Sequence, residues 1–451
     1  AGVGGEQMTR KPLGRACAFL CGVVLAASPD ARAQSALPDL TLEDLMKLDA
    51  GEVFGASERL QPVVEAPASI SFITAEEIAR YGYRTLADIL RGVRGMYVTD
   101  DRNFSLIGTR GFAKPGDYNS RILLLVNGHR MNDNVFGQAE IGAEFGLDPA
   151  MFERVEIIRG PASSLYGDSA FFAVVNVITK TGASLRGASI ALETGTLGTQ
   201  LVRAAVGRSL AGGLDVALSG TYERSDGATR LYFPAFDAPG TNNGVAEGLD
   251  GERVGQFFGH LSFKGLTLTG AYGSRLREIP TASFGTLFNE QDSREQTTDR
   301  HTLVDAQYGG SVGGTSATVR VSFDRFSYDG IYPLAGGQDG EPSIVGFNGV
   351  VGTRLTVGSG LTRAFRRKQT VRAGVEFIYN LRQDQTTRFT DSPVLFLDSA
   401  LSSTQHAIYG QDEIKLARCL IEQGDDVVAL DRQAIRGVEG LEEPLALERV
   451  E

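Results

Sequence analysis

The chain has 451 residues, of which 42% are hydrophobic and 22% charged, and its formal net charge is −11. The length allows two or three domains, and the acidic balance argues against a nucleic-acid partner. No segment after residue 33 approaches the roughly 18 uninterrupted apolar residues of a membrane-spanning helix. The 56 glycines, together with many short alternating segments, favour an all-β membrane or sandwich architecture over a helical one.

Residues 1–33 are predicted to be a leader and secretory signal peptide. Basic residues between positions 8 and 15 precede the apolar run 16–27, and Ala31-Arg32-Ala33 fits a small-x-small cleavage site. Two of the three cysteines fall in this segment and the third is Cys419. We therefore expect neither a disulfide framework nor a metal-binding cysteine pair.

Residues 34–62 form a short acidic segment before the first domain. Its second half, Glu52 to Ser57, is extended in character and follows Gly51. A stretch of this kind can add to the edge of a partner's sheet through main-chain hydrogen bonds. An ordinary linker remains the alternative interpretation.

Residues 63–182 contain sequence signals for short helices. Thr74-x-x-Glu77 and Thr85-x-x-Asp88 are capping-box signatures that predict two short helices, the first ending near Tyr81-Gly82. Asp148-Pro149 predicts a further short helical piece, with a capping aspartate and a proline in the first turn.

The strand signals of the same region predict a buried sheet. Ile122–Val126 is a continuous apolar run that ends at Asn127-Gly128, which predicts a strand covered on both faces and a type I′ turn. Arg154–Arg159 and Val174–Thr179 are rich in β-branched residues and are separated by a Gly-Pro loop, which predicts a strand pair. Residues 63–182 thus appear as a mixed α/β domain.

Beyond residue 182 apolar and polar residues alternate with a period of two. In one such run Val216 and Leu218 alternate with Ala217 and Ser219, and similar runs surround Leu261, Val321 and Val375. Runs of roughly 10 to 13 residues suit tilted strands that cross a bilayer, with the polar face toward a lumen. Long polar insertions at 227–253, 279–300, 331–349 and 383–403 are expected outside the cell. Tight turns such as Leu197-Gly198 and Gly313-Gly314 are expected at the opposite edge.

The strand pair that ends the first domain carries a recognisable sequence motif. The string from Arg154 through Gly160-Pro161 and Tyr166-Gly167 to Lys180 resembles the end of the plug domain of TonB-dependent outer-membrane receptors. The likeness extends upstream, in family order, through residues 66–78, 85–90, 107–112 and 123–128. Departures are Arg94, where the family usually has Pro, and Phe172-Ala173, where it often has Gly-Gly.

The resemblance implies an α+β plug domain at 63–182, followed by an antiparallel transmembrane β-barrel in the cell outer membrane. Segment 34–62 would then lie in the periplasm. It would carry the TonB box at Glu52, Val53, Phe54, Gly55, Ala56 and Ser57.

The resemblance also implies a set of plug-core residues: Arg110, Gly111, Asn127, Gly128, Arg159, Gly160, Pro161, Tyr166 and Gly167. Charged pairs made by Arg110 and Arg159 would lock the plug to the barrel wall, although a solvated surface position stays open for Arg110. Tyr166 and Tyr118 are assigned to core or turn roles rather than to ligand contact.

About ten candidate strands occupy 183–416, whereas plugged outer-membrane transporters close with about 22. The barrel is therefore expected to be incomplete. From residue 417 the alternation stops, and we interpret 417–451 as an aberrant tail produced by a frameshift or broken gene. Sequencing of the underlying DNA tests this interpretation.

The function that the resemblance implies is active uptake of a scarce metal chelate, such as an iron-siderophore, by a truncated copy of the receptor. Its partners would be the periplasmic energy-coupling protein TonB, outer-membrane lipid and a metal-chelate or cobalamin-like ligand, and a monomer is expected. A nonfunctional fragment, a cobalamin receptor, and a passive pore or adhesin are the alternatives.

Catalytic chemistry is not indicated by the sequence. The four histidines are widely spaced, no phosphate-binding glycine loop occurs, and no enzyme activity, cofactor or metal site is expected. The segment Asp101-x-Asn103-x-Ser105 faintly resembles a calcium loop but has Phe112 at the twelfth position, so we interpret it as a polar turn.

Overall fold

The computed structural model describes residues 52–53, 61–62, 69–113, 116–162, 166–336, 343–365, 369–390, 395–414, 420–423 and 426–429. These described residues lie within one compact unit. The predicted signal peptide, residues Phe54–Ser57 of the predicted TonB box and most of the predicted tail lie outside the described residues. Of that tail, β22 (Leu420–Gln423) and β23 (Asp426–Ala429) form an antiparallel pair.

The first two residues of the predicted TonB box are extended. They form β1 (Glu52–Val53), which pairs with β2 (Gln61–Pro62) in an antiparallel arrangement.

A mixed α/β domain follows, which we call the plug. Its strands are β3 (Ser69–Thr74), β4 (Met96–Asp100), β5 (Ser105–Thr109), β6 (Ile122–Val126), β7 (His129–Arg130), β8 (Phe152–Arg159) and β9 (Ala173–Thr179). Its helices are α2 (Ala75–Tyr81), α3 (Leu86–Arg91), the 3-10 helix η3 (Pro149–Met151) and α5 (Gly182–Leu185).

Five plug strands form one sheet in the order β3-β8-β9-β6-β7, in which only the β6–β9 pair is parallel. Strands β4 and β5 form a separate hairpin. Every residue of β6 is at most 2% exposed, as the continuous apolar run predicted. Phe152, Val155 and Ile157 of β8 belong to the same core.

The predicted local signals of the plug are confirmed. The Thr74 side chain accepts a hydrogen bond from the Glu77 amide, the Glu77 carboxylate accepts one from the Thr74 amide, and Gly82 ends α2 with φ 66°. Thr85 and Asp88 form the same box at α3. Asn127 and Gly128 have φ values of 49° and 78°, as a type I′ turn requires.

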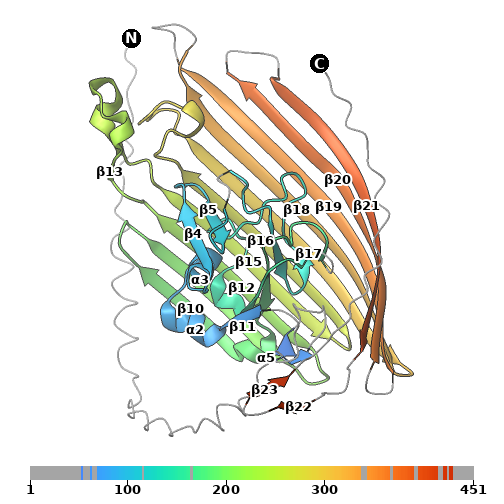
Figure 1. Cartoon of the computed structure of the whole chain (residues 1–451). Coiled ribbons are helices and arrows are strands. Elements are labelled where there is room, and N and C mark those ends of the chain that lie inside the picture. The colour runs from blue at the N-terminus through green and yellow to red at the C-terminus, as the bar shows by residue number, and fades with distance from the viewer. Residues whose placement is uncertain are drawn as a thin grey trace, which may run out of the picture. The chain divides into compact units, whose positions relative to one another are not determined.

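Ten long strands then form a single antiparallel sheet, which we call the wall. They are β10 (Gly187–Thr194), β11 (Gln200–Ser209), β12 (Asp215–Ser225), β15 (Glu252–Phe263), β16 (Leu266–Glu278), β17 (Gln296–Val312), β18 (Thr315–Leu334), β19 (Ile344–Phe365), β20 (Gln369–Phe389) and β21 (Leu397–Ile414). Each pairs with its neighbour in this order, so β10 and β21 are the two edges, and no pairing joins them within the described residues (Figure 1). The predicted ten-strand antiparallel sheet after an α+β domain is confirmed.

Short elements decorate the connections between the wall strands. The connection between β12 and β15 carries the hairpin β13 (Arg230–Tyr232) and β14 (Val245–Glu247), with 3-10 turns η4 (Pro234–Phe236) and η5 (Pro239–Gly244). A further 3-10 turn, η6 (Ser283–Gly285), precedes β17.

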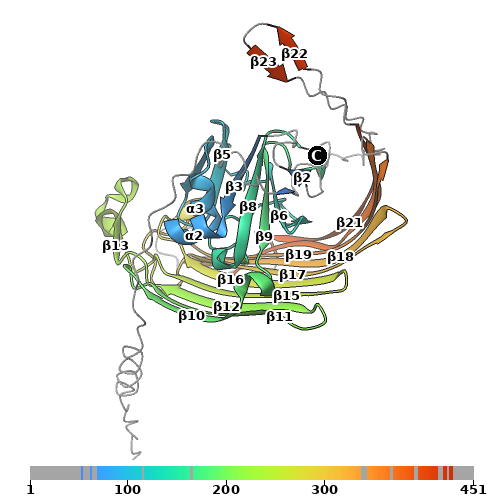
Figure 2. The same cartoon turned by 90° about the horizontal axis from the view of Figure 1, so that it is seen from below.

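The wall curves around the plug, which lies on its concave side (Figure 2). The predicted alternation is present, with polar side chains turned inward. On β12, Ala217, Ser219 and Thr221 are buried, while Leu218 and Tyr222 are exposed. Val321 and Phe323 of β18 are exposed as well. None of the helices in the described part of the chain is both long and apolar enough to cross a membrane.

Two expectations about the wall are wrong. Strands β17 to β21 contain 17 to 22 residues, so much of the predicted insertions 331–349 and 383–403 is strand. Polar residues such as Gln383 and Asp384 pair with β19 because polarity does not prevent a strand from continuing along its neighbour. The Leu197-Gly198 turn lies at the same edge as the long insertions, since the Leu197 carbonyl accepts hydrogen bonds from the amides of Asp226 and Gly227.

Candidate functional site

The candidate site is the interface between the plug and the inner face of the wall. A series of polar and charged wall residues is buried there: Ser219, Thr221, His260, Arg275, Thr297, Asp299, His301, Asp305, Ser322, Asp324, Arg354 and Asn380. Buried polar groups need hydrogen-bond partners, and plug loops carry backbone carbonyls that strands and helices do not satisfy. The buried polar groups of the wall and the unsatisfied carbonyls of the plug therefore supply hydrogen-bond partners for each other.

Arginines of the wall bind the segment that follows β6. Arg354 of β19 donates to the carbonyls of Asn132 (3.0 Å) and Arg130 (2.8 Å). Arg320 of β18 donates to the carbonyl of Asn127 (3.1 Å) and is held by an ion pair with Asp305 (2.7 Å). The predicted β6–β7 turn is therefore fixed to the wall through its main chain.

Neutral side chains continue this contact along the same plug segment. Gln383 of β20 donates to the Asn134 carbonyl (2.5 Å), and Gln256 of β15 donates to the Phe145 carbonyl (2.9 Å). Wall strands β15, β18, β19 and β20 thus form hydrogen bonds with the plug.

A second set of hydrogen bonds joins the wall to the tip of the β4–β5 hairpin. Asp101 Oδ1 accepts hydrogen bonds from the amides of Asn103 and Phe104, so this segment is the polar turn that we predicted. Arg275 donates to the carbonyl of Asn103 (2.5 Å), and Arg277 donates to that of Arg102 (2.8 Å).

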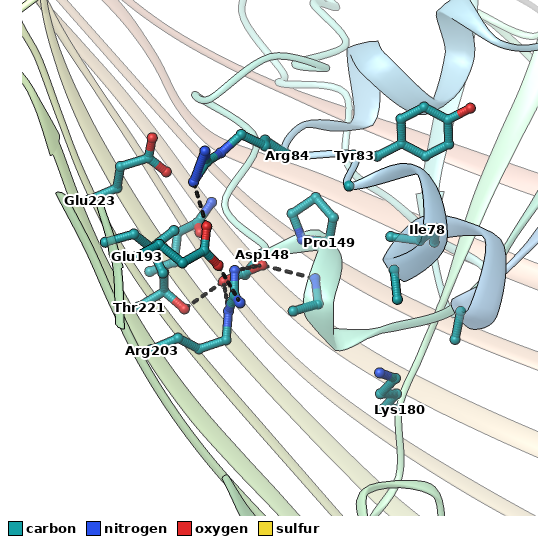
Figure 3. Close-up of a pocket in the computed structure, with 16 residues that line it drawn as sticks. Ile78, Tyr83, Arg84, Asp148, Pro149, Lys180, Glu193, Arg203, Thr221 and Glu223 are labelled. Atoms are coloured by element: carbon teal, nitrogen blue, oxygen red, sulfur yellow. Dashed lines mark hydrogen bonds and ion pairs between the residues drawn. The ribbon is translucent and has the colours of Figure 1, made fainter. Parts of the chain in front are cut away.

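A cavity of about 340 Å³ lies between α2, η3 and wall strands β10 to β12 and β15 (Figure 3). In its lining, the Asp148 carboxylate caps η3 and accepts hydrogen bonds from Arg203 (2.6 Å) and Thr221 (2.6 Å) of the wall. Arg84 of the plug pairs with Glu193 of β10 (2.7 Å). The cations and anions of this lining largely neutralise each other.

Two plug carboxyls close to the wall are buried. Burial raises the pKa of Glu144 to about 7, although the Gly142 amide donates to its carboxylate (2.9 Å). Burial also raises the pKa of Asp133, which accepts hydrogen bonds from the amides of Val135, Phe136 and Gln138. Desolvation outweighs hydrogen bonding at both positions.

The structure places the predicted plug-core residues in different environments. Asn127 and Gly128 lie at the interface, where Asn127 exchanges hydrogen bonds with Thr179 and the Gly128 amide donates to the Asn176 side chain (3.0 Å). Arg159 is half-buried and donates to the Arg94 carbonyl within the plug (2.8 Å).

The other predicted residues lie away from this contact. Arg110 and Gly111 are exposed at a turn with φ values of 53° and 85°, so the core position expected for them is wrong. The surface alternative left open for Arg110 matches its exposure. Gly160 is half-buried, Pro161 and Gly167 are exposed, and half-buried Tyr166 accepts a hydrogen bond from Arg130 through its carbonyl (2.8 Å).

Sequence reasoning missed the wall residues that bind the plug, chiefly Arg203, Arg275, Arg320, Asp324 and Arg354. A usable signal was present, because each is a charged residue at an inward position of an alternating strand. Only the register of the wall against the plug shows which carbonyl each one meets.

Comparison with known proteins agrees with this architecture. Residues 62–174 match the family described as TonB-dependent Receptor Plug Domain. The chain is 30% identical over 199 residues to "Vitamin B12 transporter BtuB" of Vibrio vulnificus, covering 43% of this chain and 30% of that protein. It is 34% identical over 159 residues to "Iron-regulated outer membrane virulence protein" of Vibrio cholerae, covering 34% of this chain and 23% of that protein.

Solved structures share the fold. The unliganded ferric citrate transporter FecA aligns over 82% of this chain and 57% of its own, with a TM-score of 0.59 and 13% identity. The pyoverdine receptor FpvA of Pseudomonas aeruginosa aligns over 85% and 60%, with a TM-score of 0.58 and 15% identity.

The chain spans less than a third of the length of the two curated relatives described above. The outer-membrane location predicted from the sequence agrees with the printed name of the Vibrio cholerae relative. Residues 62–174 are thus similar to the plug domain of TonB-dependent receptors, and the described chain shares the plug-and-wall fold of the solved structures.

Proposed function

We propose that this chain takes part in active uptake of a scarce metal chelate, such as an iron-siderophore, across the outer membrane. The observation that supports this most is a plug hydrogen-bonded to the polar face of a sheet whose opposite face is apolar and exposed. A lumen obstructed in this way requires an energy source to open. A passive pore or an adhesin has no need of such an arrangement.

The ligand class is proposed from the relatives. Their printed names are an iron-regulated outer-membrane protein, a ferrichrome transporter and a vitamin B12 transporter. Ferrichrome and vitamin B12 are both metal chelates. We place an iron-siderophore first and retain cobalamin as the second candidate, because the BtuB relative gives the longer alignment.

Energy coupling is proposed to act at Glu52 to Ser57. An extended segment can pair with the sheet edge of TonB through main-chain hydrogen bonds, and Glu52 and Val53 already have strand geometry in β1. Force applied there would act on β3, the next plug strand along the chain that the structure describes.

The test is uptake by cells that express the full chain in the outer membrane and lack their own receptors. Radiolabelled ferrichrome and radiolabelled cyanocobalamin are supplied separately, with and without TonB. We expect accumulation of one of the two that requires TonB. Accumulation of small solutes without TonB would support a passive pore and contradict the proposal, and accumulation of neither chelate would exclude ferrichrome and cobalamin as its ligands.

A further inference from the structure

Two buried histidines converge on one carboxylate where the plug meets the wall. His129 of β7, His301 of β17 and Asp324 of β18 are each 4% exposed. His129 Nε2 lies 2.8 Å and 2.9 Å from the two carboxylate oxygens of Asp324. This contact joins β7 of the plug directly to the wall.

His301 is the second histidine of the cluster, and it is incompletely satisfied. Its Nδ1 lies 3.3 Å from Oε2 of the plug residue Glu140, and its Nε2 lies 4.0 Å from Oδ1 of Asp324. His301 Nε2 and Glu140 Oε1 are buried without a hydrogen-bond partner among the described residues. A proton on Nε2 would let His301 bridge Glu140 and Asp324, and so bridge plug and wall.

The number of protons bound to the cluster sets its net charge. Arg354 of β19 lies 3.4 Å from Asp324 and is the permanent cation that contacts this carboxylate. With both carboxylates ionised and both histidines neutral, these five side chains carry one net negative charge. One imidazolium makes them neutral. Buried groups favour neutrality because an unbalanced charge is poorly solvated there.

Other charged groups face the cluster from its surroundings. Glu140 interacts electrostatically with Glu144 of the plug and with Asp299 of β17, and both of these face Arg275 of β16. Arg130 of β7 neighbours Arg354, and its guanidinium pairs with Asp168 at the plug surface. The cations Arg275 and Arg130 thus have carboxylates of their own, so they do not replace a proton on the histidines.

We propose that His129, His301, Asp324 and Glu140 form a proton-dependent latch that holds the β6–β7 hairpin of the plug against the wall. When His301 is protonated, its imidazolium interacts with Glu140 of the plug and Asp324 of the wall. When the pH rises and that proton leaves, the cluster keeps a net negative charge and the contact weakens. The contact is therefore expected to be stronger at low pH and weaker once the cluster has lost its proton.

The latch differs from a metal site. Among the residues that the structure describes, no group of three or more His, Cys, Asp or Glu side chains is arranged to hold a metal ion. It also concerns the contact of plug and wall whatever ligand is carried, so it goes beyond the proposed function and can be tested separately.

The test is hydrogen exchange of the full chain, folded in detergent micelles, at about pH 5.5 and about pH 8.5 on either side of ordinary imidazole titration. Rates are corrected for intrinsic chemical exchange. We expect residues 122–131 to open about tenfold more often at the higher pH, because the buried carboxylates then lose their imidazolium partner.

Variants separate the latch from general packing. His301→Gln keeps a polar side chain without the charge and is expected to lose most of the pH dependence. Asp324→Asn is expected to open more often at both pH values. His406→Gln, at an exposed position of β21, is the matched control and should behave as the unmodified chain.

A second measurement reads the imidazole protons directly by NMR. The latch predicts that one imidazolium is present in the cluster at the lower pH and absent at the higher pH, and that His301→Gln abolishes this change. Equal corrected exchange of residues 122–131 at both pH values would overturn the proposal, as would an unaltered pH dependence in both His301→Gln and Asp324→Asn.

Discussion

At the residue scale, single buried arginines bind the plug to the wall. Arg354 is 5% exposed, donates to two plug carbonyls and lies beside Asp324. Arginine suits this task because its planar guanidinium presents several donors in fixed directions. Removal of such a group leaves a buried carboxylate with less compensation and two carbonyls without a donor.

Arg354→Met should therefore destabilise the contact of plug and wall by about 3 kcal/mol, toward the lower end of the cost of breaking a buried ion pair. The measurement is urea-induced unfolding of the plug, monitored through hydrogen exchange of residues 122–134. Arg363→Met, on an exposed position of the same strand, is the control and should change stability by less than about 0.5 kcal/mol. Equal effects of the two substitutions would argue against the assigned role of Arg354.

Glu144 gives a prediction about pH. Its pKa in the folded chain, about 7, lies above its ordinary value of 4.5, so its contribution to stability is present at low pH and is lost as the pH rises toward and above 7. Glu144→Gln should equal the unmodified chain near pH 4 and exceed it near pH 8 by on the order of 2 to 3 kcal/mol. Chemical denaturation at both pH values measures this. Glu290→Gln, in the connection before β17, is the control, and a profile of Glu144→Gln parallel to the unmodified chain would refute the prediction.

At the scale of elements, short local signals specify the plug. The two capping boxes start α2 and α3, and the left-handed pair Asn127-Gly128 closes the β6–β7 hairpin. The Asn127 side chain adds a link beyond its own turn, because it donates to the Thr179 hydroxyl (2.9 Å) and accepts from the Thr179 amide (3.0 Å). The turn thereby ties β6 to the end of β9.

Two substitutions at this position separate backbone from side-chain effects. Asn127→Gly keeps the left-handed conformation and loses two hydrogen bonds, for a cost of about 1 to 2 kcal/mol. Asn127→Ala loses the same bonds and also places an alanine at φ 49°, which adds about 1 kcal/mol. Denaturant midpoints of the two variants give the order. Alanine at least as stable as glycine here would show that the turn is not under the inferred constraint.

At the scale of the whole molecule, the wall separates two environments. Its inner face meets the plug through charged and polar side chains, and its outer face exposes Leu218, Phe257, Val304 and Val321. This arrangement is the reverse of a water-soluble sheet, and it fits hydrocarbon outside and polar contacts inside.

The outer face should respond to charge according to depth. Val321→Lys, within β18, should weaken folding into lipid vesicles by about 2 to 4 kcal/mol, whereas Val312→Lys, at the end of β17, should cost about 1 kcal/mol or less. Equilibrium folding from urea into vesicles measures both. Equal costs at the two positions would contradict a bilayer around this face.

Much of this architecture could be predicted because its signals are local. Thr74 and Glu77 lie three residues apart on one turn, and the alternation around Leu218 needs only the period of a strand. The differences arose where resemblance or polarity was taken for position. Resemblance implied a core position for Arg110, with a surface position left open, and the residue lies exposed in a left-handed turn after β5. Residues 383–389 looked like a loop because they are polar, yet β19 pairs with them.

The sequence by itself determined the likeness to the plug domain of TonB-dependent receptors, the order of an α+β region before a ten-strand sheet, and the faces of the strands. Periodicity, caps and turn residues act over a few neighbours, so local patterns record these features. Only the tertiary structure decided which side chains join the plug to the wall, since His129 meets Asp324 across 195 positions and Arg354 reaches Asn132 across 222. Such pairs depend on how a whole sheet registers against a packed domain, and no local pattern records that register.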